Sequence, residues 1–228
     1  MKEDQAAFAI PAYVRNTMTA LEAAGHQAYC VGGCVRDSLL GQTPEDWDVT
    51  TSALPEETMA VFGERAIPTG LKHGTVTICW PGGKVETTTF RRDGTYADHR
   101  HPEHVTFTPS LEEDLARRDF TVNAMALDLR GDLHDPFHGQ ADLRDRVLRC
   151  VGDPERRFSE DALRILRCLR FAARLDFGLP GAAAGDRPGA CPGGVDQAAV
   201  RRPHGGGPAE VSESDWSGPA GGFAHGGL

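Results

Sequence analysis

The last 50 residues of the chain, 179–228, set the first limit on what it can fold into. They hold 13 of the 27 glycines and 6 of the 15 prolines, and they show no helical or strand periodicity. A segment of this composition buries too little apolar surface to offset the conformational entropy lost on ordering. We therefore expect a disordered or poorly packed tail. The 228 residues of the chain are enough for one large domain or two small ones.

Composition and charge exclude several classes of protein. The net charge of −9 argues against a protein that coats nucleic acid over its whole surface. No run approaches the roughly 18 apolar residues of a membrane span. The acidic start, interrupted by Pro11, does not resemble a signal peptide. The six cysteines contain no C-x-x-C pair, so zinc spacing is absent and reduced thiols are expected. These features predict a cytoplasmic protein without a membrane partner.

Apolar periodicity and turn residues predict alternating helices and strands before residue 178. A helix over 4–24 stops at Gly25, and an antiparallel hairpin over 73–91 turns at residues 81–83. Ser110, with Glu113 three residues later, is a good helix start. Further elements are expected as a strand at 26–33, a helix at 34–41, a strand at 46–52, a helix at 55–63 and a long loop at 92–110 that ends in a short strand.

The strongest helical pattern covers residues 159–175, with Ser159 as the expected N-cap. One face is apolar, and the opposite face is charged and mostly basic. The apolar positions are Ala162, Ile165, Leu166, Leu169, Ala172 and Ala173, and the charged positions are Asp161, Arg164, Arg167, Arg170 and Arg174. Asp161 and Arg164, three residues apart, are expected on one helical face. Taken alone, this face is a solvated row of arginines.

Asp46 and Asp48 flank Trp47 at the start of the strand predicted at 46–52. Because side chains alternate along a strand, both carboxylates are expected on one side and Trp47 inside the sheet. Adjacent carboxylates repel each other unless a cation lies between them, and oxygen ligands suit Mg²⁺. The pair is therefore a candidate metal site, and the alternative is a solvated strand edge or a turn.

Gly32 and Gly33 lie at a predicted strand-to-helix turn, where backbone N–H groups can receive a phosphate. Arg36, one turn into the helix, would add donors to a triphosphate oxygen. The alternative is a tight turn in which Arg36 and Asp37 form a surface pair.

Glu86 lies on the second strand of the predicted hairpin, where a neighbouring strand would bring it beside Asp46 and Asp48. Three carboxylates around one or two metal ions are the arrangement that nucleotidyl transfer needs. An exposed strand residue without such a role is an equal alternative for Glu86.

Taken together, these segments resemble the class II CCA-adding enzymes and bacterial poly(A) polymerases. The matching motifs, in the order and spacing of that family, are "GGCVRD" with "DWDVTTS", "VETTTFR", "EEDLARRDFTVNAMA", "DPFHGQADL" and "EDALRILRCLRFAARL". The resemblance covers residues 25–178. It implies an α+β fold, with a polymerase-beta-like nucleotidyltransferase head made of a small mixed or antiparallel sheet and flanking helices, followed by a helical neck. The implied division is an N-terminal helix at 1–24, the head at 25–138, the neck at 139–178 and the tail at 179–228.

The resemblance also implies which residues act. Asp46 and Asp48 would hold two catalytic Mg²⁺ ions, with Glu86 assisting. Arg118 would contact the nucleotide, and Asp119 and Asn123 would shape its ribose side. The full set of implied nucleotide-binding residues is Gly32, Gly33, Arg36, Arg118, Asp119, Asn123, Asp161, Arg164, Arg167 and Arg170, the last two meeting phosphates or the tRNA end.

The implied reaction adds CCA to the 3′ end of tRNA from CTP and ATP, with release of pyrophosphate. Asp161 and Arg164 would read the base, because cytosine and adenine both present an amino donor beside a ring acceptor, whereas uracil and guanine reverse that polarity. A-adding, CC-adding and poly(A) enzymes share every motif and remain alternatives. A non-catalytic nucleotide-binding remnant is the alternative from another class.

Beyond the neck, the sequence departs from this family. Its members continue with helices of a body and a tail that grip tRNA, and residues 179–228 show no such pattern. Only three of the 24 basic residues of the chain are lysine, which suggests GC-rich coding DNA. Residues 179–228 are enriched in glycine, alanine and proline, and such a composition is typical of GC-rich DNA read in the wrong frame. We therefore expect a frameshifted or otherwise aberrant terminus, with a complete active-site design and an incomplete grip on tRNA.

Overall fold

A computed structural model of the chain describes residues 8–94 and 105–179. These residues fall within one compact unit that spans Met1–Gly193. The tail predicted from residue 179 and the centre of the loop predicted at 92–110 lie outside the described residues. None of the helices in the described ranges is long and apolar enough to cross a membrane.

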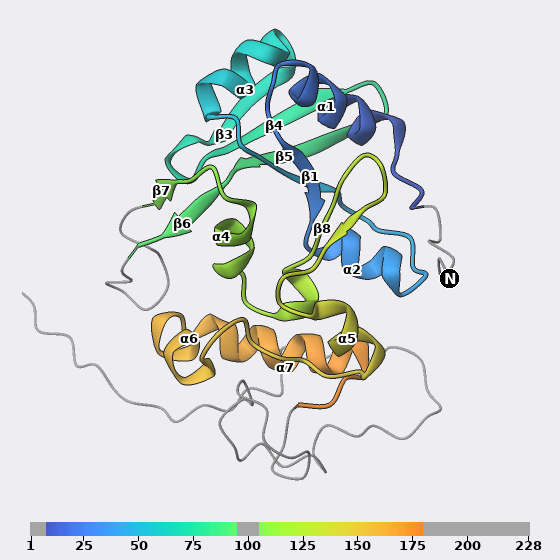
Figure 1. Cartoon of the computed structure of the whole chain (residues 1–228), viewed down its shortest axis with the longest axis vertical. Coiled ribbons are helices and arrows are strands. Elements are labelled where there is room, and N and C mark those ends of the chain that lie inside the picture. The colour runs from blue at the N-terminus through green and yellow to red at the C-terminus, as the bar shows by residue number, and fades with distance from the viewer. Residues whose placement is uncertain (1–7, 95–104, 180–228) are drawn as a thin grey trace, which may run out of the picture. The chain divides into compact units, whose positions relative to one another are not determined.

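The fold is built on a mixed seven-stranded sheet (Figure 1). All neighbouring strands are antiparallel except β2 and β5, which run parallel and set Asp48 opposite Glu86. This sheet confirms the predicted α+β fold, and β4 and β5 form the predicted hairpin. The strand order is β3 (Ala66–Gly70), β4 (Thr75–Trp80), β5 (Gly83–Thr89), β2 (Asp48–Thr51), β1 (Ala28–Val31), β8 (Ala126–Leu127) and β9 (Leu133–His134).

Helices α1 (Ala12–Ala23) and α3 (Pro55–Phe62) contact each other and the sheet, and α2 (Gly33–Leu39) follows β1 directly. Val14, Met18 and Leu21 of α1 are fully buried in the core. Trp80 Nε1 on β4 donates a hydrogen bond of 2.8 Å to Thr17 Oγ1 on α1, so the helix is also tied to the sheet by a polar contact. The helix begins after the N-cap Pro11 rather than at residue 4, because proline disfavours helical conformation in the residue before it.

The segment between the sheet and the neck contains short elements. Ser110 caps α4 as predicted, since its side chain accepts a hydrogen bond from the N–H of Glu113. The first residues of the predicted loop form a strand, because β6 pairs with β7. The bounds of these elements are η1 (Gly63–Arg65), η2 (Leu71–His73), β6 (Arg91–Asp93), β7 (Val105–Phe107), α4 (Leu111–Ala116) and η3 (Thr121–Asn123), where η marks a 3₁₀ turn.

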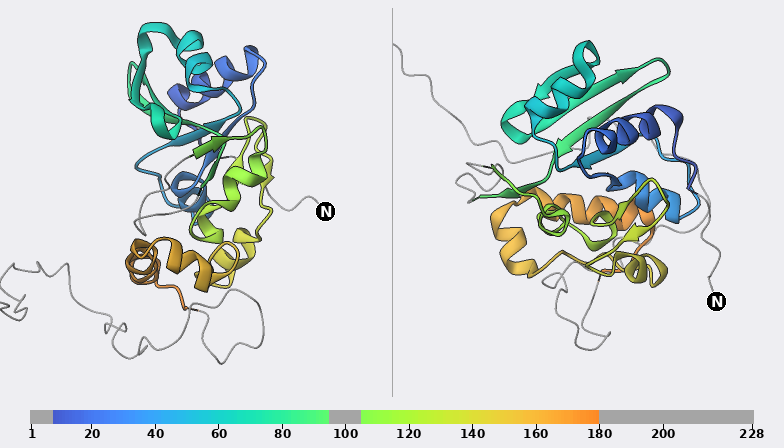
Figure 2. Two further views of the ribbon diagram at one scale, coloured as in Figure 1. Left: turned by 90° about the vertical axis from the view of Figure 1, so that its left-hand side faces the viewer. Right: turned by 45° about the horizontal axis from the view of Figure 1, so that its top comes forward.

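The C-terminal described segment forms α5 (Gly139–Arg144), α6 (Pro154–Glu160) and α7 (Leu163–Leu175). Figure 2 shows from two sides that α6 and α7 lie at the end of this unit away from α1 and α3. They occupy the predicted neck, whose boundary at residue 138 stays a prediction.

The single helix predicted at 159–175 is wrong in its first turn. Asp161 adopts extended backbone angles of φ −144° and ψ 105° and separates α6 from α7. Its Oδ1 atom accepts a hydrogen bond of 2.9 Å from the N–H of Leu163, a local bond that competes with helix continuation. Ser159 therefore lies inside α6, which is capped instead by Asp153 and has Pro154 in its first turn.

The apolar face predicted for this helix is buried only in part. Arg164, Cys168 and Ala172 are buried, whereas Ile165 and Leu166 are 46% and 63% exposed. Arg164 turns inward because Glu160 and the backbone oxygen of Arg157 on α6 accept hydrogen bonds from it, whereas Arg167, Arg170 and Arg174 are exposed. Burial of this arginine is set by polar partners and not by the apolar pattern.

Turn η3 rests directly on α5. Asp142 Oδ2 accepts a hydrogen bond of 2.7 Å from Thr121 Oγ1 and pairs with Arg149 at 3.1 Å. Both carboxylate oxygens of Asp135 accept N–H bonds at the start of α5, from Gly139 at 2.7 Å and Gln140 at 2.9 Å. These contacts fix the turn on which Asn123 lies.

Gly139 allows this close approach, because a Cβ at its position would lie 2.2 Å from the backbone oxygen of Thr121. We expect Gly139→Ala to lower the free energy of unfolding by about 1–3 kcal/mol, the usual effect of overpacking a filled site. Urea denaturation measures this change. Gly178→Ala is the control, because an added Cβ there meets only Arg146 O at 3.9 Å. Equal losses in the two variants would contradict this role of Gly139.

Candidate functional site

A cavity of about 840 Å³ opens between the sheet edge, α2, η3 and α7, and we call it the central cavity. It gathers twelve of the thirteen predicted site residues, from segments that are distant in the sequence. Glu86 does not line it. The predicted residues on its wall are Gly32, Gly33, Arg36, Asp46, Asp48, Arg118, Asp119, Asn123, Asp161, Arg164, Arg167 and Arg170.

The glycine turn brings backbone and arginine close together at one wall of the central cavity. Gly32 has φ 79° and ψ −130°, a conformation that side-chain-bearing residues rarely adopt. A Cβ on Gly32 would lie 3.0 Å from Arg118 Nη1. Glycine is therefore suited to this position for two reasons. It adopts the backbone angles of the turn into α2, and it leaves room for the guanidinium of Arg118.

Arg36 is buried and held by three neighbours. Its Nε and Nη2 atoms lie 2.8 Å and 2.7 Å from Asp37 Oδ1, and Nη1 donates to Asn123 Oδ1 at 2.6 Å. Its guanidinium also lies over the Phe171 ring, 5.2 Å from the centroid. The alternative of a surface pair with Asp37 is wrong, because both residues are buried. The predicted contact with a triphosphate stays a prediction.

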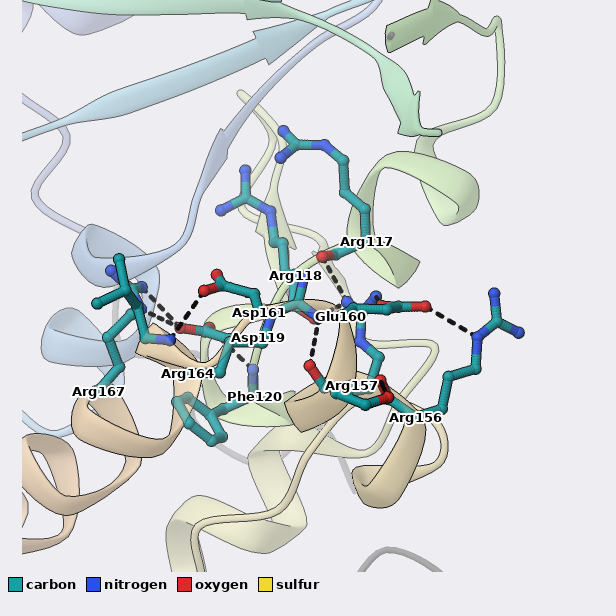
Figure 3. A network of polar contacts seen from close by, with 12 residues as sticks. Arg117, Arg118, Asp119, Phe120, Arg156, Arg157, Glu160, Asp161, Arg164 and Arg167 are labelled. Atoms are coloured by element: carbon teal, nitrogen blue, oxygen red, sulfur yellow. Dashed lines mark hydrogen bonds and ion pairs between the residues drawn. The ribbon is translucent and has the colours of Figure 1, made fainter. Parts of the chain in front are cut away.

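Asp119 continues this chain of contacts to α7. Its Oδ1 atom accepts hydrogen bonds from the backbone N–H of Phe120 at 2.8 Å and from Asn123 Nδ2 at 3.3 Å. Its Oδ2 atom accepts from Arg167 Nε at 2.8 Å and Nη2 at 2.6 Å (Figure 3). A continuous polar chain therefore runs from α2 through η3 to α7, and it orders one wall of the central cavity.

Asp114 organises the arginines that follow α4. It is fully buried, and its Oδ1 atom accepts from Arg117 Nε at 2.9 Å and from the backbone N–H of Arg91 at 3.2 Å. Its Oδ2 atom accepts from Thr50 Oγ1 at 3.1 Å and lies 3.8 Å from Arg118 Nη2. One carboxylate thus joins β2, β6 and the end of α4.

Asp46 and Asp48 both line the central cavity, as predicted from their spacing. Asp48 is the first residue of β2, Asp46 precedes the strand and is exposed, and Trp47 between them is buried in the core. The pKa of Asp48 is raised, chiefly by burial and further by Glu86 and Asp46, against the opposing effect of Arg118. Glu86 is exposed and acts on Asp48 from the neighbouring strand.

The two aspartates suit a cation in their chemistry. Among the described residues, neither side chain accepts a hydrogen bond or forms an ion pair with another residue, so their negative charge is not neutralised by a direct partner. Carboxylate oxygens are the ligands that Mg²⁺ prefers. No group of three or more histidine, cysteine, aspartate or glutamate side chains in the described ranges is arranged to hold a metal. The Asp46–Asp48 pair therefore has suitable ligands for Mg²⁺, but it supplies only part of a coordination shell.

Asp161 and Arg164 both line the central cavity, with a geometry that differs from the prediction. Because Asp161 lies between two helices, the two residues do not share one helical face, and Arg164 Nε lies 3.9 Å from Asp161 Oδ2. Arg164 Nη1 also donates to Glu160 Oε2 at 3.1 Å and to the backbone oxygen of Arg157 at 3.0 Å. The arginine is thus pre-oriented by groups outside the predicted pair.

Several wall residues were not among the predicted site residues. Arg117 and Arg174 lie inside the quoted motifs and would have been found by treating every arginine there as a candidate. Arg91, on β6, ends the quoted motif "VETTTFR" and would have been found in the same way, whereas His73, in η2, is brought to the central cavity only by the tertiary fold. Phe171 looks like an ordinary core residue in the sequence, yet it lies between Arg36 and Arg167, whose guanidinium groups are 5.2 Å and 5.6 Å from its ring centroid.

Comparison with known proteins gives consistent matches over the same part of the chain. The profile of the family described as "Poly A polymerase head domain" matches residues 28–149, more than half of the chain. The CCA-adding enzyme of Lactobacillus helveticus (strain DPC 4571) is 54% identical over 159 residues, which are 70% of this chain and 40% of that enzyme. The chain therefore spans about two fifths of the length of the curated relatives it matches.

Solved structures agree with these matches. The crystal structure of the Bacillus stearothermophilus CCA-adding enzyme in complex with CTP has a TM-score of 0.66 and 48% identity, over 72% of this chain and 39% of that one. A tRNA nucleotidyltransferase complexed with a primer tRNA and an incoming ATP analogue has a TM-score of 0.57 and 38% identity, over 71% of this chain and 45% of that one.

The raised pKa of Asp48 predicts how stability depends on pH. Between the ordinary carboxyl pKa and the raised one, the folded chain binds more protons than the unfolded chain, so the free energy of unfolding falls as pH rises. We expect Asp48→Asn to raise the melting temperature at pH 7 by about 2 °C, because it removes this buried charge. The gain disappears below the unfolded carboxyl pKa of 3.8. A variant that melts below the wild type at pH 7 would count against this cause.

Proposed function

Because this chain belongs to the poly A polymerase head-domain family, we propose that it carries the nucleotide-binding and catalytic part of a CCA-adding tRNA nucleotidyltransferase. In this proposal CTP and ATP are the substrates, the tRNA 3′ end is the acceptor, and pyrophosphate is released. We place the reaction in the cytoplasm. The similarity to CCA-adding enzymes, one of them in complex with CTP, supports the proposal.

The observation that carries the proposal is the meeting of three kinds of group at the central cavity. The carboxylates Asp46 and Asp48, the glycine turn with Arg118, and the pair Asp161 and Arg164 all line it. A nucleoside triphosphate presents a reacting phosphate, a charged tail and a base, and each needs one of these groups. A volume of about 840 Å³ lies within the range of pockets that bury a ligand of this size.

The charged groups of the central cavity suit the proposed roles. Asp46 and Asp48 would hold Mg²⁺, which when bound lowers the pKa of an attacking hydroxyl and neutralises charge on the leaving pyrophosphate. Arg118 is partly exposed beside the glycine turn, and its Nε atom is buried without a hydrogen-bond acceptor in the described residues. Its guanidinium would bind the triphosphate. Glu86 would assist from β5 by strengthening the negative field at Asp48.

The base would be read by Asp161 and Arg164. A carboxylate accepts from an exocyclic amino group and a guanidinium donates to a ring nitrogen or carbonyl, so the pair fits cytosine and adenine. Arg167 and Arg170, further along α7, would meet phosphates of the nucleotide or of the tRNA end. Arg36, Asp119 and Asn123 would order the wall between these groups through the polar chain described above.

A-adding, CC-adding and poly(A) polymerases remain alternatives within the same family. A nucleotide-binding module that does not transfer to tRNA is a second candidate. Incorporation of labelled CTP and ATP, each alone and together, into tRNA ending at the discriminator base, at C or at CC separates the family alternatives. Melting-temperature elevation by CTP with Mg²⁺, without incorporation, would identify the binding module.

Asp46→Ala tests the proposed metal site. We expect it to lower nucleotide incorporation by at least about a hundredfold, the scale on which loss of one electrostatic stabiliser acts. Its circular dichroism and melting temperature are expected to change little, because Asp46 is exposed and precedes the strand. Glu56→Ala, which removes an exposed acid in the first turn of α3, is the control. Full activity of Asp46→Ala would overturn the assignment.

Mg²⁺ binding can also be read without catalysis. We expect added Mg²⁺ to raise the melting temperature of the wild type, because it neutralises the adjacent charges of Asp46 and Asp48. The same addition is expected to leave Asp48→Asn nearly unchanged. A metal-induced rise of equal size in both proteins would place the ion elsewhere.

A further inference from the structure

Arg157 on α6 contacts the end of another element in the unit. Its Nη2 atom lies within hydrogen-bond distance of three successive backbone oxygens, those of Ala116 at 3.3 Å, Arg117 at 2.5 Å and Arg118 at 2.6 Å. The last carbonyls of a helix have no partner within the helix. The guanidinium from α6 therefore satisfies the C-terminal end of α4 (Figure 3).

The same guanidinium is tied to the residues proposed to read the base. Glu160 Oε2 accepts hydrogen bonds from Arg157 Nη1 and from Arg164 Nη1, both at 3.1 Å. Although burial raises the pKa of Glu160, its arginine neighbours outweigh that effect and hold the pKa below the usual value. An ionic chain thus runs from Arg164 through Glu160 and Arg157 to the backbone of Arg118.

Arg118 has few side-chain contacts of its own to fix its position. In the described part of the chain its Nε atom is buried without a hydrogen-bond partner, and Nη2 lies 3.8 Å from Asp114. Nη1 lies against Gly32, which offers no side chain. The direction of this guanidinium therefore depends on where its backbone is held, and Arg157 holds that backbone.

We propose that Arg157 is a positioning residue that keeps Arg118 and Arg164 at a fixed separation across the central cavity. A nucleoside triphosphate would then meet its triphosphate-binding and base-reading groups already in place, which lowers the ordering cost of binding. This inference rests on the proposed function for its ligand, and on the hydrogen bonds above for its mechanism. Arg157 itself does not line the central cavity, so it acts through Arg118 and Arg164.

The neighbouring Arg156 provides a matched control. It also pairs with Glu160, with its Nε atom 2.9 Å from Oε1, but its side chain is 79% exposed. It makes no contact with the carbonyls at the end of α4. Arg156→Ala and Arg157→Ala therefore remove the same charge and a bond to the same glutamate, and they differ in the burial of the side chain and in the link to the backbone oxygens of residues 116–118.

CTP binding in the presence of Mg²⁺ is the first measurement. We expect Arg157→Ala to weaken CTP binding by about tenfold, the scale of a lost hydrogen bond to a charged group, and Arg156→Ala to stay within about twofold of the wild type. Millimolar guanidinium should restore part of the CTP binding of folded Arg157→Ala, and it should not change the CTP binding of the wild type or of Arg156→Ala. Arg157→Lys is the second variant if the alanine variant does not fold, and it should also bind weakly because an ammonium does not reproduce the planar fork.

A second measurement needs no ligand and separates this inference from the proposed function. The NMR signal of the Arg118 Nε–H can be assigned because it is absent from Arg118→Lys. In the wild type this hydrogen should exchange slowly with solvent, because the Nε atom is buried. We expect the signal to shift and exchange faster in the Arg157 variants but not in Arg156→Ala. If the wild type binds no CTP, the proposed function fails while this signal still tests the positioning role. Unchanged CTP affinity, or an unchanged Arg118 signal, in folded Arg157 variants would overturn the inference.

Discussion

The ion pair between Asp119 and Arg167 is the contact on which the central cavity depends. Asp119 is only 8% exposed, and a carboxylate at that depth is stable only with a cation and hydrogen-bond donors around it. Arg167 supplies two of those donors from α7, and Asn123 and the backbone of Phe120 supply the others. Because Asn123 also accepts from Arg36, the position of α2 follows from the same pair. Removing the charge of Arg167 would leave the buried Asp119 carboxylate without its cation and loosen the wall that this chain of contacts orders.

The central cavity contains charged groups whose burial costs free energy. Burial and two neighbouring acids raise the pKa of Asp48, and Arg118 only partly offsets them. Burial likewise lowers the pKa of Arg118, although Asp114 and Asp48 oppose that shift. Asp48 has no direct partner among the described residues and Arg118 has only the 3.8 Å pair with Asp114, so weakly compensated charges of both signs lie at one place, in contrast to the closely paired charges along η3 and α6. A site that must receive a charged ligand and a cation is where such unbalanced groups are expected.

What the sequence predicted well was local. The hairpin at 73–91, the cap at Ser110 and the alternation around Trp47 depend on residues a few positions apart, and all three are present. What it predicted wrongly was decided by individual polar contacts. The break at Asp161 follows from the bond between its side chain and the N–H of Leu163, and the burial of Arg164 follows from Glu160 and the backbone oxygen of Arg157. Hydrophobic periodicity shows neither contact. The capping of α4 by Arg157 was not predicted, because every residue has a backbone carbonyl and the sequence does not show which carbonyls a distant arginine contacts.

The bonds that build the central cavity join residues that are far apart along the chain. Arg36 and Asn123 are 87 positions apart, Thr50 and Asp114 are 64, and Asp119 and Arg167 are 48. Closing a contact of high sequence separation costs loop entropy that a local hairpin such as β4 and β5 does not lose. We therefore expect a chain with many such contacts to fold more slowly than one built from local pairs, and the geometry of the site to depend on these long-range contacts.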